Sequence, residues 1–414
     1  MSENVFAVRV QWIMKRPVSH CTLLAAIATP FLALLLLPAG PCPAAQAGNS
    51  QPLALPAPTG PHPIGTAIFY LRDMSRKDPL AASSGRFREL AVQIWYPANR
   101  REGASAAPYI PDPALLTAMK KEQYLNLEPE VLDSWACLRT HSTPGAPILT
   151  SPRRLPLLLF SHGFSVSRSN YTSIVQDLAS HGYILAAIDH PYVGLTVLPE
   201  GRVLSFTPEA GGPNPGAAAR RVEAMAQDAS FVLNALLDGK SEAGQFARRI
   251  DPNRVGMLGH SIGGAAALES CRTSTRFKAC ADLDGDAWGK VETEGVGQPF
   301  LVLLNEPAEA HRPPAAMREQ RDKGWADLIA KKKTAAFIVK IGSTNHFSFS
   351  DVPFIVPEAL MEKNGAFIKP QRGFEIITRV LRAFFSRYVC DREVEPLEVV
   401  TKDYPEVSLS VFNQ

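Results

Sequence analysis

The residues best suited to chemistry are a serine framed by two glycines, in the run GHSIG at residues 259–263. Apolar residues of strand character precede this run at 255–258, and small residues typical of a closely packed helix follow it at 264–267. A Gly-x-Ser-x-Gly motif between a strand and a helix is typical of a nucleophile elbow, a sharp turn that exposes the serine hydroxyl. Glycine is favoured two residues before and after the serine, because these positions crowd each other and glycine has no Cβ. Ser261 is therefore the predicted nucleophile.

A serine hydroxyl needs a base to act as a nucleophile at neutral pH, and that base is usually a histidine. Well downstream of Ser261 the chain offers only His311 and His346. His346 follows a predicted strand directly, in a loop of small and polar residues that could project the ring back over the serine. His311 precedes two prolines in a polar segment that is typical of solvated surface. His346 is the predicted base.

The acid that orients this histidine is expected in the run ADLDGD at residues 281–286. Asp284 lies at the end of a predicted strand and just before a glycine turn, which suits a carboxylate that holds a histidine in one tautomer. Asp286 is the alternative. The alternating aspartates also resemble the start of a calcium loop, but that pattern requires glycine next and glutamate at position twelve. Ala287 and Thr293 occupy those positions, so we reject a calcium site.

An oxyanion hole needs two N–H groups aimed at the position where negative charge develops. One is expected from Ile262, directly after the serine. The other is expected from Phe164, because the His162-Gly163 pair after a buried strand lets the chain turn sharply there. His162 itself is expected to be a structural hydrogen-bonding residue.

Composition limits the other function classes. The chain has 414 residues, 46% of them hydrophobic and 20% charged, which suits one large globular domain. Its formal net charge of +3 is too small to indicate nucleic acid as a partner. No run of His, Cys, Asp or Glu has metal-ligand spacing, so neither a metal nor a cofactor is predicted.

The N-terminus has the pattern of an export signal. Lys15 and Arg16 precede an apolar run at 23–37, and a small-x-small cleavage site ends at Ala47. Residues 1–47 are therefore predicted to be a signal peptide, with the mature protein in the periplasm or outside the cell. A retained N-terminal membrane anchor is the alternative, although the apolar run is shorter than the roughly 20 residues that span a bilayer.

Four cysteines would remain after cleavage: Cys137, Cys271, Cys280 and Cys390. An even number in an oxidising compartment suggests disulfides. Cys271 and Cys280 are the predicted pair, because they would close a short loop between the elbow helix and the next strand.

The chain divides into a signal peptide, a proline-rich linker at 48–63, a domain at 64–392 and a C-terminal tail at 393–414. Two strands at 66–71 and 89–96 are expected to form an antiparallel pair. Residues 103–153 are expected to be a helical insertion. This insertion is a candidate cap over the site or a lipid-facing surface, and a packed pair of surface helices is the alternative.

From residue 155 onward, apolar strands alternate with helices, which predicts an α/β fold with a mostly parallel sheet covered by helices on both faces. The expected strands are at 155–160, 183–188, 255–258, 279–283, 300–304 and 335–341. The expected helices are at 171–180, 217–237, 314–331 and 374–388.

The runs LLLFSHGF at 157–164, DLASHGYILAAIDH at 177–190 and GHSIGG at 259–264 resemble the plasma-type (isoform II) platelet-activating-factor acetylhydrolase family and its bacterial relatives. The similarity spans nearly all of residues 60–390. It implies an α/β-hydrolase fold and metal-independent cleavage of short or oxidised acyl esters. The roles it implies match those above: Ser261 as nucleophile, Asp284 as acid, His346 as base, and Phe164 and Ile262 as oxyanion donors.

Two features depart from the family pattern. Phenylalanine is frequent where Ile262 stands, which matters little if only the backbone N–H is used. The animal enzymes have a single aspartate where this chain has DLDGD, which is why Asp286 is kept as the alternative acid.

These observations predict an exported serine esterase that acts on short-chain carboxylic esters through an acyl-enzyme. One candidate substrate is the sn-2 acetyl or short acyl group of glycerophospholipids, with peripheral contact to lipid surfaces. A polyester or cutin-type hydrolase, or a general carboxylesterase, is the alternative within enzymes. A non-catalytic binding protein on a hydrolase scaffold is the alternative from another class.

Overall fold

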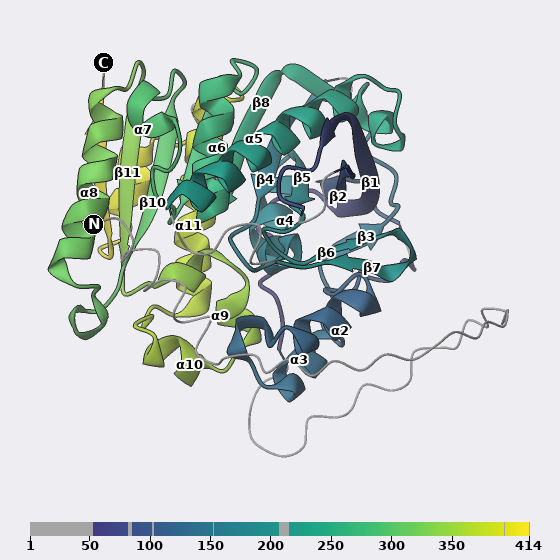
Figure 1. Cartoon of the computed structure of the whole chain (residues 1–414), viewed down its shortest axis with the longest axis horizontal. Coiled ribbons are helices and arrows are strands. Elements are labelled where there is room, and N and C mark those ends of the chain that lie inside the picture. Colours follow the sequence, from purple (N-terminus) through teal and green to yellow (C-terminus); the bar gives the residue numbers. More distant parts are fainter. Residues whose placement is uncertain are drawn as a thin grey trace, which may run out of the picture.

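The structure is a computed structural model that describes residues 53–81, 85–101, 103–151, 153–206, 215–392 and 394–413 (Figure 1). The predicted signal peptide at 1–47 and the first part of the predicted linker lie outside these residues. Within the described part of the chain, no helix is both long and apolar enough to cross a bilayer.

A ten-stranded mixed sheet forms the centre of the molecule, in the order β12-β11-β10-β9-β8-β4-β5-β2-β1-β3. The six strands from β11 to β5 in this order run parallel, and β1 pairs antiparallel with β2. This arrangement confirms the predicted fold class. The strands are β1 (Ile64–Lys77), β2 (Phe87–Pro97), β3 (Ser142–Pro144), β4 (Leu155–Ser161), β5 (Ile184–Asp189), β8 (Ile250–His260), β9 (Ala279–Leu283), β10 (Phe300–Glu306), β11 (Ala336–Gly342) and β12 (Val407–Phe412).

The central strands are apolar throughout because both of their faces are buried. In β4, Leu158 and Phe160 belong to the core on one side of the sheet, and Leu157 and Leu159 belong to the core on the other. All four side chains are fully buried. Successive side chains of a strand point to opposite faces, so a continuous apolar run is required when helices cover both.

Helices cover both faces of this sheet. α5 (Pro215–Leu237), α6 (Ile262–Thr273) and α8 (Ala315–Ala330) pack on the near face in Figure 1. α4 (Thr172–Ser180) and α11 (Pro370–Tyr388) contribute to the core on the other face. Several shorter elements are α7 (Val291–Glu294), α9 (Val352–Ile355), α10 (Glu358–Lys363), α12 (Leu397–Lys402) and the hairpin of β6 (Thr196–Leu198) and β7 (Arg202–Leu204).

The segment 103–153 contains α2 (Pro113–Lys121) and α3 (Pro129–Trp135), which lie with α9 and α10 at the lower edge of Figure 1. The Asp112 side chain caps α2 by accepting a hydrogen bond from the Ala114 N–H. A lipid-facing insertion would expose the apolar side chains of α2, but Leu115 and Met119 are 4% and 0% exposed. They belong to the main core, so α2 does not present them to a lipid surface.

The ends of the domain are more ordered than the sequence suggested. The predicted tail at 393–414 contains α12 and β12, and β12 pairs antiparallel with β11 along its whole length. The segment predicted to be a tail therefore supplies the edge strand β12 of the sheet. The second part of the predicted linker packs on α4, where the Thr59 N–H and hydroxyl both donate to Asp177.

The predicted disulfide between Cys271 and Cys280 is not present. Both cysteines are buried free thiols inside the core on the α6 side of the sheet. Burial, followed by the neighbouring Cys271 thiol, raises the pKa of Cys280. In this environment the two residues pack as small apolar side chains. Cys390 is also buried and free.

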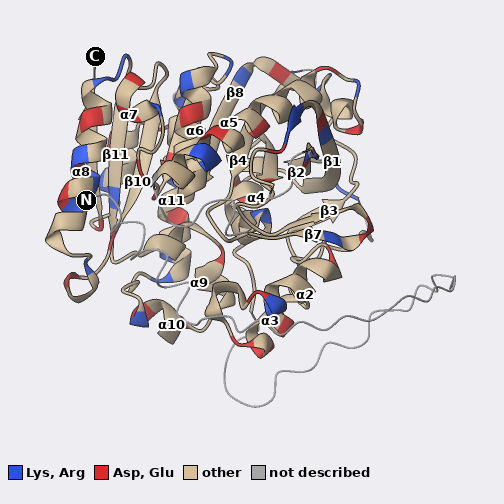
Figure 2. Ribbon diagram, in the orientation of Figure 1, with Lys and Arg blue, Asp and Glu red and all other residues tan. Residues whose placement is uncertain are grey.

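Charged residues of both signs alternate over the elements drawn in Figure 2. Several form local pairs, such as Lys323 with Asp327 on α8 and Arg372 with Glu406 beside β12. This interspersed pattern agrees with the small net charge of +3.

Candidate active site

Ser261 occupies the sharp turn between β8 and α6. Its backbone has φ 58° and ψ −125°, an unusual conformation for a residue with a side chain. The Ser261 N–H donates to the Leu283 carbonyl over 2.9 Å, which ties the turn to the neighbouring strand β9. A Cβ on Gly259 would lie 2.2 Å from the Gly263 carbonyl oxygen, so glycine is required at this approach. Strained backbone of this kind is concentrated at functional sites.

Asp284 lies directly after β9 and its carboxylate is fully buried. Its Oδ2 atom is 2.6 Å from the His346 Nδ1 atom. The Asn305 backbone N–H donates to Oδ1 over 2.9 Å, and the Asn305 side-chain amide donates to Oδ2. The Arg321 guanidinium lies 3.9 Å from Oδ1. Asp284 is thus held by β10 on one side and faces the histidine ring on the other.

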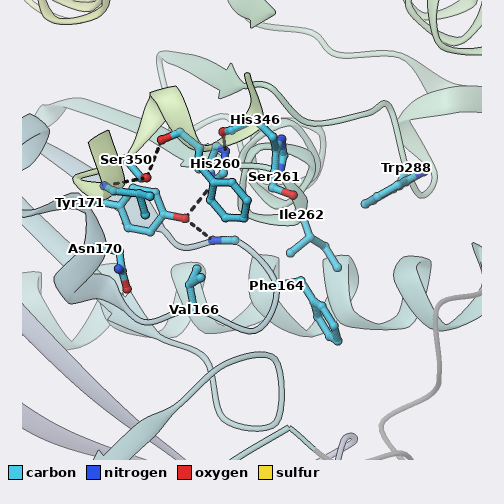
Figure 3. Close-up of a pocket in the computed structure, with 13 residues that line it drawn as sticks. Phe164, Val166, Asn170, Tyr171, His260, Ser261, Ile262, Trp288, His346 and Ser350 are labelled. Atoms are coloured by element: carbon cyan, nitrogen blue, oxygen red, sulfur yellow. Dashed lines mark hydrogen bonds between the residues drawn. The ribbon is translucent and has the colours of Figure 1, made fainter. Parts of the chain in front are cut away.

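His346 begins the short helical turn η7 (His346–Phe349), which follows β11. Its side chain is 24% exposed, and it lines the same pocket as Ser261. Figure 3 shows the ring beside the serine hydroxyl at the wall of this pocket. A hydroxyl, an imidazole and a carboxylate in this order can carry out proton transfer to and from an attacking serine.

The two expected oxyanion donors come from separate loops that meet at this pocket. Ile262 is the first residue of α6, and Phe164 follows Gly163 in the loop after β4; both line the pocket with Ser261. An N–H group at a helix N-terminus carries a partial positive charge, which favours negative charge nearby. Trp288 lines the same pocket beyond Ile262 (Figure 3).

A second Ser–His–Asp set lies inside the protein and is not exposed. The Ser161 hydroxyl lies 2.8 Å from His190 Nε2, and His190 Nδ1 lies 2.8 Å from an Asp228 oxygen. Arg88 pairs with the same carboxylate. All four side chains are fully buried, so a substrate has no access to them. This set connects β2, β4, β5 and α5, and we interpret it as structural.

His162 belongs to this buried region. Its Nε2 atom accepts a hydrogen bond from the His190 N–H over 2.9 Å, and its Nδ1 atom lies 2.7 Å from the Gly163 carbonyl. Burial lowers the pKa of His162 to about 3, with the nearby His190 as a smaller cause. A neutral, fully bonded imidazole in this position suits the expected structural role.

The other candidates lie elsewhere. His311 is exposed in a short turn after β10, and its ring packs 5.7 Å from that of Phe367. Asp286 is nearly buried two residues beyond Asp284, and its carbonyl accepts a hydrogen bond from the Trp288 N–H. Among the residues that the structure describes, no group of three or more His, Cys, Asp or Glu side chains could hold a metal ion.

Several residues of the site were not predicted from the sequence, among them Asn305, Tyr171 and His260. Asn305 carries one available signal, because a polar residue ends the apolar strand β10 at the edge where Asp284 emerges. Tyr171 and His260 line the pocket and bond to each other over 2.8 Å. No sequence pattern indicates this pair, because the two residues are 89 positions apart.

Several known proteins are similar to this chain over most of its length. The family described as platelet-activating factor acetylhydrolase, isoform II, matches residues 47–192 and 222–398. A probable 1-alkyl-2-acetylglycerophosphocholine esterase from Arthroderma benhamiae is 26% identical over 85% of this chain and 92% of its own length. The platelet-activating factor acetylhydrolase of Gallus gallus is 23% identical over 83% of this chain and 85% of its own length.

Among solved structures, a ferulic acid esterase from Streptomyces cinnamoneus superposes with a TM-score of 0.69 and 29% identity. The superposition covers 87% of this chain and 99% of the esterase. The residues matched by the family include every described residue that lines the pocket, as well as Asp284. The chain therefore belongs to the platelet-activating factor acetylhydrolase isoform II family and is a carboxylic ester hydrolase.

Proposed function

We propose that this protein is an exported serine esterase that hydrolyses short-chain carboxylic esters through an acyl-enzyme. The observation that carries the proposal is the meeting of the strained Ser261 turn and the Asp284–His346 pair in one pocket. The sequence pattern of residues 1–47 supports export, and the intact mass of exported protein, expected to start at Gly48, tests that part.

In the proposed mechanism, the Ser261 oxygen attacks the ester carbonyl carbon while its proton passes to Nε2 of His346. The negative charge on the carbonyl oxygen is stabilised by the N–H groups of Phe164 and Ile262. His346 then gives the proton to the departing alkoxide, which leaves the acyl group on Ser261. Water attacks this acyl-enzyme with His346 as base, and the serine recovers its proton as the acid leaves.

Asp284 keeps His346 in the required tautomer. Its carboxylate accepts a hydrogen bond from Nδ1–H, so Nε2 is left free to receive the serine proton. The two donors from Asn305 hold the carboxylate in place. The same carboxylate stabilises the imidazolium that forms during each proton transfer.

The names of the relatives favour an acetyl or short acyl ester of a glycerophospholipid as the substrate. An aromatic or polyester substrate is the second candidate, because Phe164 and Trp288 give the pocket an aromatic wall. The ferulic acid esterase among the structural neighbours supports this alternative. A short-acyl phospholipid, a ferulate ester and a soluble polyester oligomer, compared by kcat/KM, distinguish the two.

The central test is Ser261→Ala. We expect this variant to lose ester hydrolysis and fluorophosphonate labelling while it keeps its thermal stability, because a single hydroxyl contributes little to packing. Ser270→Ala is a matched control, since that serine is buried in α6, donates to the Ala266 carbonyl and does not line the pocket. Substantial turnover by purified Ser261→Ala would refute the assignment. A wild-type protein that does not react with the fluorophosphonate would favour a binding protein.

A further inference from the structure

A chain of hydrogen bonds connects the loop that carries Phe164 to the loop that carries His346. The Gly163 N–H donates to the Tyr171 hydroxyl oxygen over 3.0 Å. The same hydroxyl lies 2.8 Å from Nδ1 of His260, and Nε2 of His260 lies 2.9 Å from the His346 carbonyl oxygen. Figure 3 shows the Tyr171 hydroxyl directed at the His260 ring, with a dashed line for the hydrogen bond between them.

We propose that Tyr171 and His260 are positioning residues, which fix the oxyanion loop, the nucleophile turn and the base loop relative to one another. Tyr171 comes from η2 (Arg168–Tyr171), His260 directly precedes Ser261, and His346 begins η7. Neither side chain takes part in the proposed proton transfers. The inference depends on the proposed function, because it assigns these residues to the same reaction.

With a neutral His260, the hydrogen bonds from Gly163 through Tyr171 and His260 to His346 have one consistent set of proton positions. A carbonyl oxygen only accepts, so Nε2 of His260 must carry the proton that it shares with His346. In a neutral imidazole Nδ1 is then an acceptor, and the Tyr171 O–H must donate to it. The Tyr171 oxygen is left to accept from Gly163 N–H. Every donor has an acceptor, so one tautomer of His260 satisfies the whole chain.

The chain is also buried and closely packed, which makes it rigid. Tyr171 and His260 are 1% and 3% exposed. A Cβ on Gly163 would lie 3.0 Å from both the Tyr171 hydroxyl and His260 Nδ1, so the backbone passes directly over the bond between them. The Tyr171 ring packs 4.7 Å from Phe160, and the His260 ring packs 4.4 Å from His346.

Such rigidity matters because the oxyanion donors and the base must be placed together. Electrostatic stabilisation requires N–H donors that are already oriented when charge develops. A misplacement of about 1 Å can cost about 100-fold in rate. A neutral His260 would also favour the reaction for a second reason: its ring lies against His346, and a positive charge there would oppose formation of the imidazolium.

Tyr171→Phe removes one hydroxyl and both of its hydrogen bonds. We expect kcat to fall by about 10- to 100-fold with little change in KM. The affinity for a trifluoromethyl ketone, which forms an oxyanion on Ser261, should fall by a similar factor as kcat/KM. Affinity for the product alcohol, which makes no oxyanion, should stay unchanged. A purely structural role would lower stability without this parallel loss.

Tyr96→Phe is the matched control. Its hydroxyl is also buried and donates to the Ala146 carbonyl over 2.8 Å, on the far side of β2 from the pocket. We expect this variant to lose a similar amount of thermal stability and to keep its kcat. If Tyr171→Phe keeps kcat within about twofold of the wild-type value, or if Tyr96→Phe loses as much activity, the proposal is wrong.

His260 provides the second arm of the experiment. His260→Gln retains one acceptor and one donor, whereas His260→Leu retains neither, so we expect Gln to preserve more activity. Adding Tyr171→Phe to His260→Leu should cost little more, because the bond is already broken; equal, additive losses would overturn the coupling. Ester hydrolysis by Ser261→Ala would instead refute the proposed function. The losses measured for the Tyr171 and His260 variants would then have to be explained by a different reaction.

Discussion

Asp284 illustrates how much chemistry depends on the environment of a single carboxylate. The chain presents aspartates at 282, 284 and 286, and all three are buried or nearly so. Asp282 accepts from the Gly285 N–H and so supports the turn itself. Asp284 faces His346 and is held by Asn305. Of the three carboxylates, that of Asp284 is therefore the one placed to set the tautomer of His346. The Asp284 backbone has a positive φ of 56° at this turn.

We expect Asp284→Asn to lower kcat by about three to four orders of magnitude, because an amide can stabilise the wrong tautomer of His346. Asp286→Asn should be much milder, since the carboxylate that pairs with the His346 ring remains. Steady-state kinetics of the two purified variants on a nitrophenyl ester provide the measurement. The reverse ranking would assign the acid role to Asp286 and leave Ser261 and His346 unaffected.

The type of a residue predicted its role only where a sequence motif also fixes the surrounding structure. Ser261 could be predicted because its glycine frame requires a tight turn. The buried set of Ser161, His190 and Asp228 has the same residue types, yet it is inaccessible and structural. Tyr171 and His260 could not be predicted, because their bond depends on how two distant segments pack.

At the scale of elements, the elbow depends on the close packing of β8, α6 and the end of β4. A Cβ on Gly263 would lie 2.2 Å from the Ser161 carbonyl oxygen and 2.6 Å from that of His162. Ser161 is the last residue of β4, and His162 is the first residue of the loop that carries Phe164. The position of α6 against β4 therefore sets where Ile262 and Phe164 can meet.

Gly263→Ala should accordingly damage both stability and activity. Two backbone carbonyls would have to move, and overpacking of this kind costs about 1–3 kcal/mol. We expect a lower Tm and at least about a tenfold loss of kcat, because the displaced segment carries the oxyanion donor. Gly297→Ala is the control, since a Cβ there meets nothing within 4 Å. If Gly263→Ala matched this control in Tm and kcat, the close approach would not matter.

Element prediction succeeded where burial leaves a continuous apolar run, as in β4 and β9. It failed for β12, whose sequence VSLSVF alternates and which is only partly buried at the sheet edge. A short alternating strand after a helix gives a weak pattern, and its partner β11 lies more than 60 residues away in the chain. Likewise, cysteine spacing could not show that Cys271 and Cys280 pack as free thiols.

At the scale of the molecule, none of the described residues of the insertion, 103–151 and 153, lines the pocket that contains Ser261. It contributes Leu125 and Leu127 to a neighbouring apolar pocket, together with Val356 and Leu360. Phe347 and Val352 line both pockets, and we interpret them as the wall between the two. We therefore expect this wall, and not a cap made by the insertion, to limit the length of the acyl group.

Acetate and butyrate esters should outpace dodecanoate by at least about tenfold in kcat/KM, which corresponds to about 1.4 kcal/mol of transition-state binding. The physical reason is that Phe347 closes the pocket toward the second apolar space. Phe347→Ala should open this passage and reduce the preference for short chains. A chain-length series of nitrophenyl esters, measured below the critical micelle concentration, tests both statements.

Two further variants separate the wall from other effects of Phe347, which directly follows His346. Val352→Ala truncates a second side chain of this wall, at the start of α9. It should shift the chain-length preference in the same direction, with a smaller effect on the hydrolysis of acetate esters. Phe367→Ala removes an exposed ring outside this pocket and should change nothing. A wild-type rate that climbs steadily with chain length and jumps above the critical micelle concentration would identify a true lipase. In that case the wall at Phe347 does not limit the acyl group, and the short-chain assignment falls with it.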